Sequence, residues 1–435
     1  MIHSLSMENV GPAPRMEMEF GTRLNLITGD NGLGKSFLLD TIWWALTRKW
    51  PHEINSNLTS GFKARPSDPT QPATIQFKLE SKTKPVTYQS QYVARDQAWT
   101  GKAGRPHNPG LVIYAQADGG FSVWDPLRNY WKTRGKIDSQ DCLPGFVFAA
   151  RDVWDGLDMT TREGKPVRVC KGMIDDWGGW IAAKSDESRR MNSVLKSLSP
   201  SSDAGDRLVA ESTKRISTND PRDIPAVRIG TGPEVPILFS SAGIKRVAQL
   251  AYMLTWTWAE HRRAAELLGE ERTRQVIFLI DEIECHLHPR WQRTILNSLI
   301  KMIQVIHKSA KIQLIASTHS PLVMASAEPH FDSKQDAWFD MDLDRESGLV
   351  ELRNRPFIRM GDASNWLMSE AFDLPQAISP EAESAILAAL ELFRESNPHG
   401  QRIQEVDKDL RATLGELDPF WDKWSRFRNS RLATA

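Results

Sequence analysis

A glycine-rich stretch near the N-terminus, GDNGLGKS, has the residue types needed to hold a phosphate group. Gly29, Gly34, Lys35 and Ser36 complete the pattern G-x-x-x-x-G-K-[ST], after the apolar run RLNLIT and before a segment with helical spacing. Glycines let backbone N–H groups turn toward phosphates, and the start of a helix adds partial positive charge. The alternative is a chance match in a strand–turn–helix. The sequence therefore predicts a nucleotide-binding loop, made by Gly29, Asp30, Asn31, Gly32, Leu33, Gly34, Lys35, Ser36 and Phe37.

Two carboxylates follow a second apolar run, VIFLIDE (276–282). A buried strand that presents Asp281 and Glu282 at its carboxyl end is unfavourable unless these charges are used. We expect Lys35 to reach the β- and γ-phosphates and Ser36 and Asp281 to hold Mg²⁺, for Asp281 directly or through water. Glu282 would polarise the water that attacks the γ-phosphate. The alternative is a pair of acids that only cap the next helix.

Two smaller motifs complete the candidate site. STHSP (317–321) again follows a buried strand, and its His319 could contact the γ-phosphate, although a lone histidine at a strand end is more often structural. FSSAGIKR (239–246) is a turn of small residues that opens a helix and offers free N–H groups and a hydroxyl to a phosphate. By itself this turn would be an ordinary helix N-cap. Its candidate nucleotide-binding residues are Ser240, Ser241, Ala242 and Gly243.

The elements that must position these motifs follow from hydrophobic periodicity. QVIFLI (275–280) and KIQLIAST (311–318) have the apolar, β-branched composition of buried parallel strands, and WQRTILNSLIKMIQVIHK between them has helical spacing. This order implies a parallel α/β core with a right-handed crossover. Residues 73–125 are predicted to form strands separated by turns, including a hairpin around ADGG.

These patterns divide the chain into four regions. We expect an N-terminal lobe with the phosphate loop and a β-subdomain (1–150), a helical insertion (151–235), a C-terminal lobe with the other motifs (236–358) and a helical extension (359–435). In the extension, Ser379 is the expected N-cap of a helix and Pro380 its first residue. No heptad pattern persists long enough for a long coiled coil.

Composition excludes several classes of protein. The formal net charge is zero, so no global basic field indicates nucleic acid. No apolar run approaches the roughly 20 residues that span a bilayer, and the N-terminus lacks the pattern of a secretory signal. Three scattered cysteines offer neither a disulfide framework nor a Cys-x-x-Cys metal site. We expect a cytoplasmic protein with no membrane partner.

The four motifs, in the order phosphate loop, SSAG turn, FLIDE and STHSP, resemble those of ABC-type ATPase heads of the RecF/SMC-like class. LIDEIECHLHPRWQR (279–293) is similar to the acidic HLHP block of OLD-like ATPases. The motifs cover the first and last thirds of the head, and residues 50–235 carry none. The resemblance implies an α/β fold, namely an ABC-type P-loop head with an antiparallel β-subdomain, and ATP and Mg²⁺ as ligands.

The resemblance also implies a homodimer of heads, either alone or within a higher oligomer. In this class the signature turn of one head, here Ser240 to Gly243, completes the ATP site of the other, and ATP binding closes the pair. Hydrolysis, using Glu282 and His319, reopens it. This signature has one of the two usual glycines and lacks the glutamine. A glutamine for the Q-loop is not placed by the sequence, and Gln116 in IYAQADGG is a weak candidate among others.

SAGIKRVAQLAYMLTWTWAEH, DEIECHLHPRWQR and THSPLVMASAEPHFD are similar to prokaryotic anti-phage ATPases of the Septu and retron-associated kinds. That similarity implies a separate HNH nuclease effector; PARIS-type ATPases, with a Toprim nuclease, are a close rival. An intrinsic Toprim nuclease is not expected, because the acids of WFDMDLD (338–344) lack the preceding strand with its glutamate. The alternatives are a RecF-like repair ATPase that acts on DNA directly and an ATP-locked scaffold with little turnover.

Three further features allow binding hypotheses. The stretch RNYWKTRGK combines Arg128, Lys132, Arg134 and Lys136 with Tyr130 and Trp131, a mixture that suits contact with DNA or RNA, although a solvated β-loop is the simpler interpretation. The aromatics and arginines of DPFWDKWSRFR (418–428) suit either an interface with the effector or packing on its own head. His286 and His288, beside Glu284, could bind zinc, but we favour a role at the dimer interface, where the resemblance places this block.

Overall fold

The computed structural model describes residues 1–80, 84–101, 107–130, 143–160, 164–201, 203–306, 310–395 and 398–432. They form two compact units, Met1–Ala363 and Ser364–Ala435. The sequence had placed the start of the C-terminal extension at residue 359. Within the described residues, no helix is long and apolar enough to cross a bilayer.

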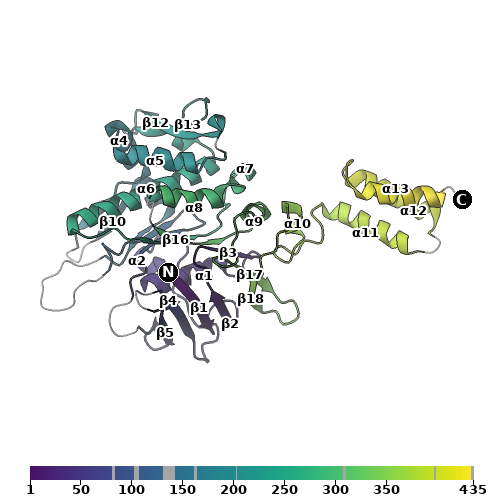
Figure 1. Ribbon diagram of the computed structural model, residues 1–435, viewed down its shortest axis with the longest axis horizontal. Coiled ribbons are helices and arrows are strands. Elements are labelled where there is room, and N and C mark those ends of the chain that lie inside the picture. The colour runs from purple at the N-terminus through teal and green to yellow at the C-terminus, as the bar shows by residue number, and fades with distance from the viewer. Residues whose placement is uncertain are drawn as a thin grey trace. The chain divides into compact units, whose positions relative to one another are not determined.

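An eight-stranded sheet is the centre of the first unit (Figure 1). Its five middle strands, β17, β3, β16, β15 and β7, run parallel, and antiparallel strands flank them on both sides. This confirms the predicted α/β core and the hairpin around ADGG, which joins β7 to β8. In spatial order the strands are β18 (Val350–Arg355), β17 (Ala337–Leu343), β3 (Leu24–Gly29), β16 (Lys311–Ser317), β15 (Gln275–Ile280), β7 (Leu111–Ala115), β8 (Phe121–Trp124) and β9 (Phe146–Phe148).

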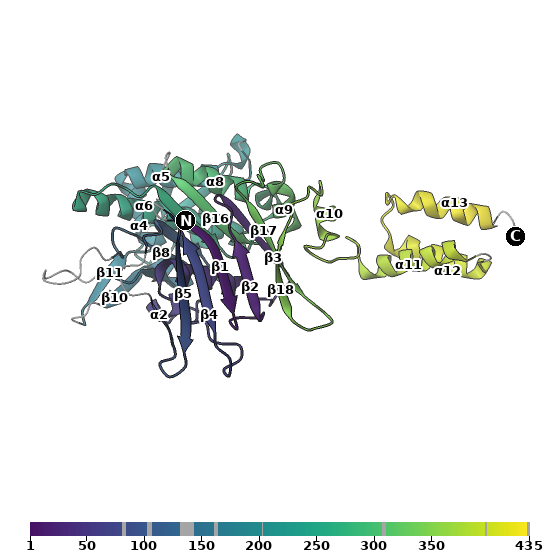
Figure 2. The same ribbon diagram turned by 60° about the horizontal axis from the view of Figure 1, so that its bottom comes forward.

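A second, antiparallel sheet forms the predicted β-subdomain, and its strands lie side by side in Figure 2. Helix α1 (Lys35–Thr47) lies between the two sheets: Trp43 packs beside Tyr114 of β7, and Trp44 packs edge-on to Phe77 of β4. All residues from Leu38 to Thr47 are buried, as expected for a helix that is apolar on every side. The strands, in spatial order, are β2 (Arg15–Glu19), β1 (Ile2–Glu8), β4 (Thr74–Leu79), β5 (Val86–Val93) and β6 (Ala98–Trp99).

Helices cover the opposite face of the eight-stranded sheet (Figure 1). The long α6 begins at the SSAG turn, and α8 makes the crossover between β15 and β16 that the sequence predicts. Besides α1 and the insertion helices α4 and α5 described below, the helices found in the described part of the first unit are α2 (Pro51–Ile54), α3 (Ala150–Asp155), α6 (Ala242–Leu268), α7 (Pro289–Gln292), α8 (Ile295–Ile306) and α9 (Pro321–Ala327).

The insertion at 151–235 differs from the helical segment that we expected. It contains α4 (Met173–Ala183) and α5 (Asp186–Ser197), but also the hairpin β10 (Leu157–Thr160)–β11 (Pro166–Cys170) and the sheet β12 (Leu208–Lys214), β13 (Ile224–Ile229) and β14 (Val235–Pro236). These strands are short, and β12 has a bulge where it pairs with β13. Such segments bury few residues at period 2, so their alternation is a weak signal beside two amphipathic helices. Short 3₁₀ turns occur at η1 (Ala204–Asp206) and η2 (Ile237–Phe239).

The second unit is a small helical bundle, α11 (Pro380–Arg394), α12 (Gly400–Thr413) and α13 (Phe420–Leu432); α10 (Ala363–Leu367) begins at its boundary. Ser379 accepts a hydrogen bond from the N–H of Ala382, and Pro380 is the first helical residue, as predicted. The aromatics of DPFWDKWSRFR are not a free surface, because Trp424 is fully buried and Phe427 packs against the same core. The sequence alone does not distinguish buried aromatics from exposed ones here, because the same residue types suit a core and an interface.

Asp407 organises this bundle. Its carboxylate accepts hydrogen bonds from Trp424 Nε1 (2.8 Å), Arg428 Nη1 (2.9 Å) and Arg411 Nε (2.8 Å). Burial acts to raise the pKa of Asp407, but these hydrogen bonds outweigh it and the pKa is lowered. One carboxylate therefore joins α12 to α13.

Replacing Asp407 with Ala should destabilise the second unit by about 1–3 kcal/mol, because the buried indole N–H of Trp424 would lose its acceptor. Amide hydrogen exchange in α12 and α13 should become correspondingly faster. Asp409→Ala, on an exposed side chain of the same helix, is the matched control and should leave exchange unchanged. Equal exchange in the two variants would contradict the prediction.

Candidate functional site

The glycine-rich loop joins β3 to α1 in a conformation that few side chains would allow. Gly29 and Gly34 have φ values of 132° and 102°. A Cβ at Gly29 would lie 2.2 Å from the carbonyl oxygen of Met341 in β17, and one at Gly34 would lie 2.8 Å from Pro12 Cγ. The loop therefore needs glycine for both dihedral angle and space. Ser36, in the first turn of α1, remains exposed.

Lys35 is buried beneath the loop, with 5% of its surface exposed. Its Nζ donates hydrogen bonds to the carbonyl oxygens of Gly29 and Asp30, both at 2.7 Å. Burial lowers the pKa of Lys35, and the negative charges of Asp281 and Glu282 act in the opposite direction. The cation thus lies in the field of the two predicted carboxylates.

Asp281 and Glu282 follow β15, and the hydroxyl of Ser317 at the end of β16 links them. Ser317 Oγ donates to Asp281 Oδ1 (2.7 Å) and accepts from the backbone N–H of Glu282 (2.8 Å). Glu282 has a φ of 48°, in the left-handed region that is unusual for a glutamate. Residues held in such conformations cluster at functional sites. Ser317 was not singled out by the sequence, because its role depends on two strands that meet only in the fold.

His319 follows Ser317 and belongs to the same group of charges. Burial lowers its pKa, the positive charge of Lys35 lowers it further, and Asp281 acts in the opposite direction. The imidazole is therefore largely neutral near pH 7. The structure thus brings together the loop, the acid pair and His319, as predicted, at the carboxyl ends of three neighbouring parallel strands.

The signature turn, Ser240 to Gly243, lies against the HLHP block. Ser241 caps α6, and its side chain accepts from the N–H of Ile244. A Cβ at Gly243 would lie 2.8 Å from the carbonyl oxygen of His286, so the start of α6 is in close contact with the HLHP block. Phe239, just before the turn, is 67% exposed.

Gln116, a weak Q-loop candidate in the sequence, has a buried side chain in the structure. It directly follows β7, at the point where the N–H of Asp281 donates to Ala115 O (2.9 Å). Its side chain is 1% exposed, and neither amide atom has a hydrogen-bond partner among the described residues. An unpaired buried amide is costly, so this side chain is suited to a polar ligand beside Asp281. The signal that could have found it is its place one residue after a buried strand.

The chain matches a family model over most of its length. A family model described as "AAA domain, putative AbiEii toxin, Type IV TA system" matches residues 24–325, which include the loop, the acid pair and His319. The chain belongs to this family. The matched region includes β3, β7, β8, β9, β15 and β16 of the central sheet and ends before β17 and β18. With the antiparallel sheet beside α1, the fold is an ABC-type P-loop ATPase head.

Two curated relatives match different lengths of the chain. The Septu protein PtuA of Bacillus thuringiensis is 23% identical over 96% of this chain and 95% of that protein. The retron Vc95 probable ATPase of Vibrio cholerae is 31% identical over 32% of this chain and 24% of that protein. Among solved structures, an SMC head domain from Thermotoga maritima aligns with 82% of this chain and 99% of that chain, at 14% identity and a TM-score of 0.38.

Two other candidate residues in the AAA domain make contacts within the chain. Arg128, one of the basic residues considered for contact with nucleic acid, is largely buried with its guanidinium 3.8 Å from the ring centre of Phe146, and burial lowers its pKa. Trp131, Lys132, Arg134 and Lys136 lie outside the described residues. His288 caps α7 by accepting from the N–H of Arg290, and the described residues contain no cluster of three or more metal-ligating side chains.

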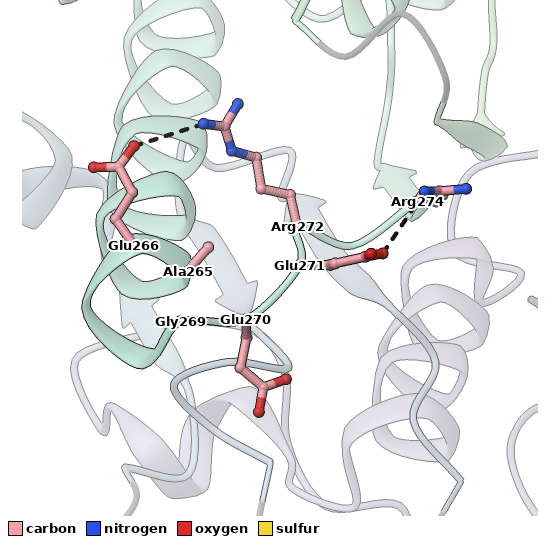
Figure 3. Close-up of a pocket in the computed structure, with 7 residues that line it drawn as sticks. All are labelled: Ala265, Glu266, Gly269, Glu270, Glu271, Arg272 and Arg274. Carbon is pink, nitrogen blue, oxygen red and sulfur yellow. Dashed lines mark ion pairs between the residues drawn. The ribbon is translucent and has the colours of Figure 1, made fainter.

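A charged hollow of about 490 Å³ lies at the C-terminal end of α6 (Figure 3). Arg272 pairs with Glu266 and Arg274 with Glu271, each at 3.6 Å, so most of the charge in the hollow is neutralised. Exposed ion pairs of this kind contribute little to folding stability. Because α6 has 27 residues, the hollow is roughly 40 Å from the signature turn at the helix start. None of the predicted site residues lines it.

Asp40 makes the folding stability of the protein depend on pH. It lies in α1, one turn beyond the loop, where burial raises its pKa from 3.8 to about 7; the hydrogen bonds from Tyr114 and the N–H of Gly61 oppose this shift. Between these pH values the folded protein binds more protons than the unfolded chain. Folding stability contributed by Asp40 is therefore complete below pH 4 and lost as the pH rises through 7.

Asp40→Asn should remove this dependence, because asparagine can still accept from the N–H of Gly61 and does not ionise. Between pH 5 and 7 the wild type should lose at most about 1.4 kcal/mol per pH unit relative to the variant. Melting temperatures of the two proteins from pH 5 to 8 would measure this. Asp96→Asn, at an exposed position, is the control, and parallel curves for wild type and Asp40→Asn would contradict the prediction.

Proposed function

We propose that this AAA domain protein binds and hydrolyses ATP and regulates a separate nuclease in prokaryotic anti-phage defence. The observation that carries the ATPase proposal is the convergence of Lys35, the acid pair and His319 at one end of three parallel strands. The residues fit a triphosphate. A Cβ at Gly29 or Gly34 would clash with neighbouring atoms, so the loop keeps its backbone bare there, and Lys35 is buried beside it. The buried side-chain amide of Gln116 has no hydrogen-bond partner among the described residues.

Each residue has a role in this proposal. The N–H groups of the loop and Lys35 bind the β- and γ-phosphates, for which Nζ must leave the two carbonyl oxygens that it contacts in this structure. Ser36 and Asp281 would hold Mg²⁺, which neutralises charge on the phosphates. Glu282 orients and polarises the attacking water from a left-handed backbone position that Ser317 Oγ holds through the Glu282 N–H. His319, neutral near pH 7, donates a hydrogen bond to the γ-phosphate.

We also propose that ATP joins two heads. Ser240, Ser241, Ala242 and Gly243 would bind the nucleotide held by the second copy, with the exposed Phe239 at the same face. Support comes from the position of the turn at the start of a 27-residue helix, whose dipole favours an anion there. Hydrolysis would then separate the heads.

A nuclease effector, of HNH type or, as the rival, Toprim type, is proposed as the partner. The similarity to the Septu protein PtuA over 96% of the chain supports a defence role. Two acids of WFDMDLD, Asp340 and Asp342, are part of β17, and Asp340 accepts a hydrogen bond from Thr28 of β3 (2.8 Å). Asp340 therefore serves the central sheet, which supports a nuclease on another chain.

The ATPase proposal is tested by two substitutions. Lys35→Ala should abolish binding of a fluorescent ATP analogue, because the buried cation is lost. Glu282→Gln should retain binding, reduce phosphate release at least about 100-fold and accumulate an ATP-dependent dimer in size-exclusion chromatography with light scattering. Lys49→Ala, at an exposed lysine beyond α1, should behave as wild type. Normal hydrolysis by Glu282→Gln would overturn the assignment.

The second unit is the proposed docking site for the effector. A chain that ends at Ala363 should retain ATP binding and lose co-purification with a nuclease encoded beside its gene; a cut at residue 400 would split the bundle core and is less informative. In the full chain, Leu387→Glu and Leu417→Glu change side chains that are 53% and 97% exposed, and should weaken the complex without unfolding the bundle. Undiminished co-purification of the truncated chain would exclude this docking site.

A further inference from the structure

Glu284 connects the two halves of the candidate site. It lies two residues after Glu282, and its carboxylate accepts from Thr318 Oγ1 at 2.7 Å and from the backbone N–H of His319 at 2.5 Å. Both donors belong to the STHSP segment, more than thirty positions further along the chain. One side chain after β15 thus fixes the direction in which the chain leaves β16.

The surroundings of the Glu284 carboxylate act on its pKa in opposite directions. Burial raises the pKa of Glu284 and the charge of Glu282 raises it further, whereas the hydrogen bonds from Thr318 and His319 lower it. A buried acid costs stability unless its hydrogen bonds are satisfied. Here the two donors that satisfy it are those that orient His319.

A second side chain of the same block holds the next residue of the STHSP segment. Ser320 Oγ donates to Gln292 Oε1 (2.7 Å), and Gln292 Nε2 donates to the carbonyl oxygen of Leu287 (2.8 Å). The N–H of Leu287 in turn donates to the carbonyl oxygen of Glu284 (2.8 Å). Hydrogen bonds therefore hold Thr318 and His319 to Glu284, and Ser320 to Gln292, within one short segment of the chain.

We infer that Glu284 is a positioning residue for His319: it sets the place of the imidazole through the backbone N–H and Thr318, without itself touching nucleotide. This inference rests on the proposed ATP hydrolysis. A group that fixes the backbone at Thr318 and His319 restricts where the side chain can reach, and misplacing a catalytic group by about 1 Å costs roughly 100-fold in rate.

Three substitutions separate positioning from general stabilisation. Glu284→Gln can keep both contacts, since its Oε1 accepts from the N–H of His319 and its Nε2 can donate to the Thr318 hydroxyl. Glu284→Ala keeps neither contact. Glu284→Asp keeps the negative charge on a shorter side chain. If the alanine variant does not fold, this variant tests the positioning role instead.

The decisive measurement is a double-mutant cycle on ATP hydrolysis with His319→Ala. Glu284→Ala should reduce kcat at least about tenfold with KM changed less than about twofold, and should add nothing to His319→Ala. Glu284→Gln should stay within about threefold of wild type. Glu187→Ala, which removes a buried glutamate that pairs with arginines of α6, is the matched control and should leave kcat unchanged.

A second readout does not depend on turnover. Amide hydrogen exchange in residues 317–320 should accelerate in Glu284→Ala and Glu284→Asp and remain as in wild type in Glu284→Gln. Wild-type protein without ATP hydrolysis would refute the proposed function, while the exchange data would still decide whether Glu284 positions the segment. Additive effects of Glu284→Ala and His319→Ala on kcat, or unchanged exchange in Glu284→Ala, would overturn the inference.

Discussion

Helix α1 has to be buried on almost every side while the loop that leads into it stays open to solvent. The residues from Leu38 onward fill the space between two sheets, whereas Asn31, Gly32 and Ser36 remain exposed. The hydrophobic effect on the long part of the helix therefore holds the short polar part in place. Because the phosphate loop is continuous with a buried strand on one side and this helix on the other, its shape is determined by the core rather than by its own contacts.

The electrostatics of the site follow from the same packing. Parallel strands place their carboxyl ends along one edge, which brings acids from β15 close to the lysine after β3. Ser317 uses its one hydroxyl twice, toward the carboxylate of Asp281 and the backbone N–H of Glu282, and so ties the Asp281 side chain to the backbone that carries Glu282. A protein of zero net charge thus concentrates opposite charges at one place.

The parts of the fold that the sequence predicts are those with strong local signals. The apolar runs before the loop, the acid pair and STHSP are buried strands, and Ser379 is an N-cap, because period and composition are local properties. The contacts of Glu284 and Gln292 with STHSP depend on which strands become neighbours, and one sequence does not contain that information. Arg128 illustrates the same limit: basic and aromatic residues suit a nucleic-acid contact or a solvated loop, whereas in the fold its guanidinium lies over the ring of Phe146 and is largely buried.

The close approach of Gly243 to His286 has a consequence for how a second copy would meet this head. With backbone lying directly on backbone, there is no layer of side chains between the first turn of α6 and the HLHP block that could absorb a displacement. The two segments must therefore shift together or not at all. A partner pressing on the turn would act on a rigid block that reaches through residues 284–287 to the STHSP segment.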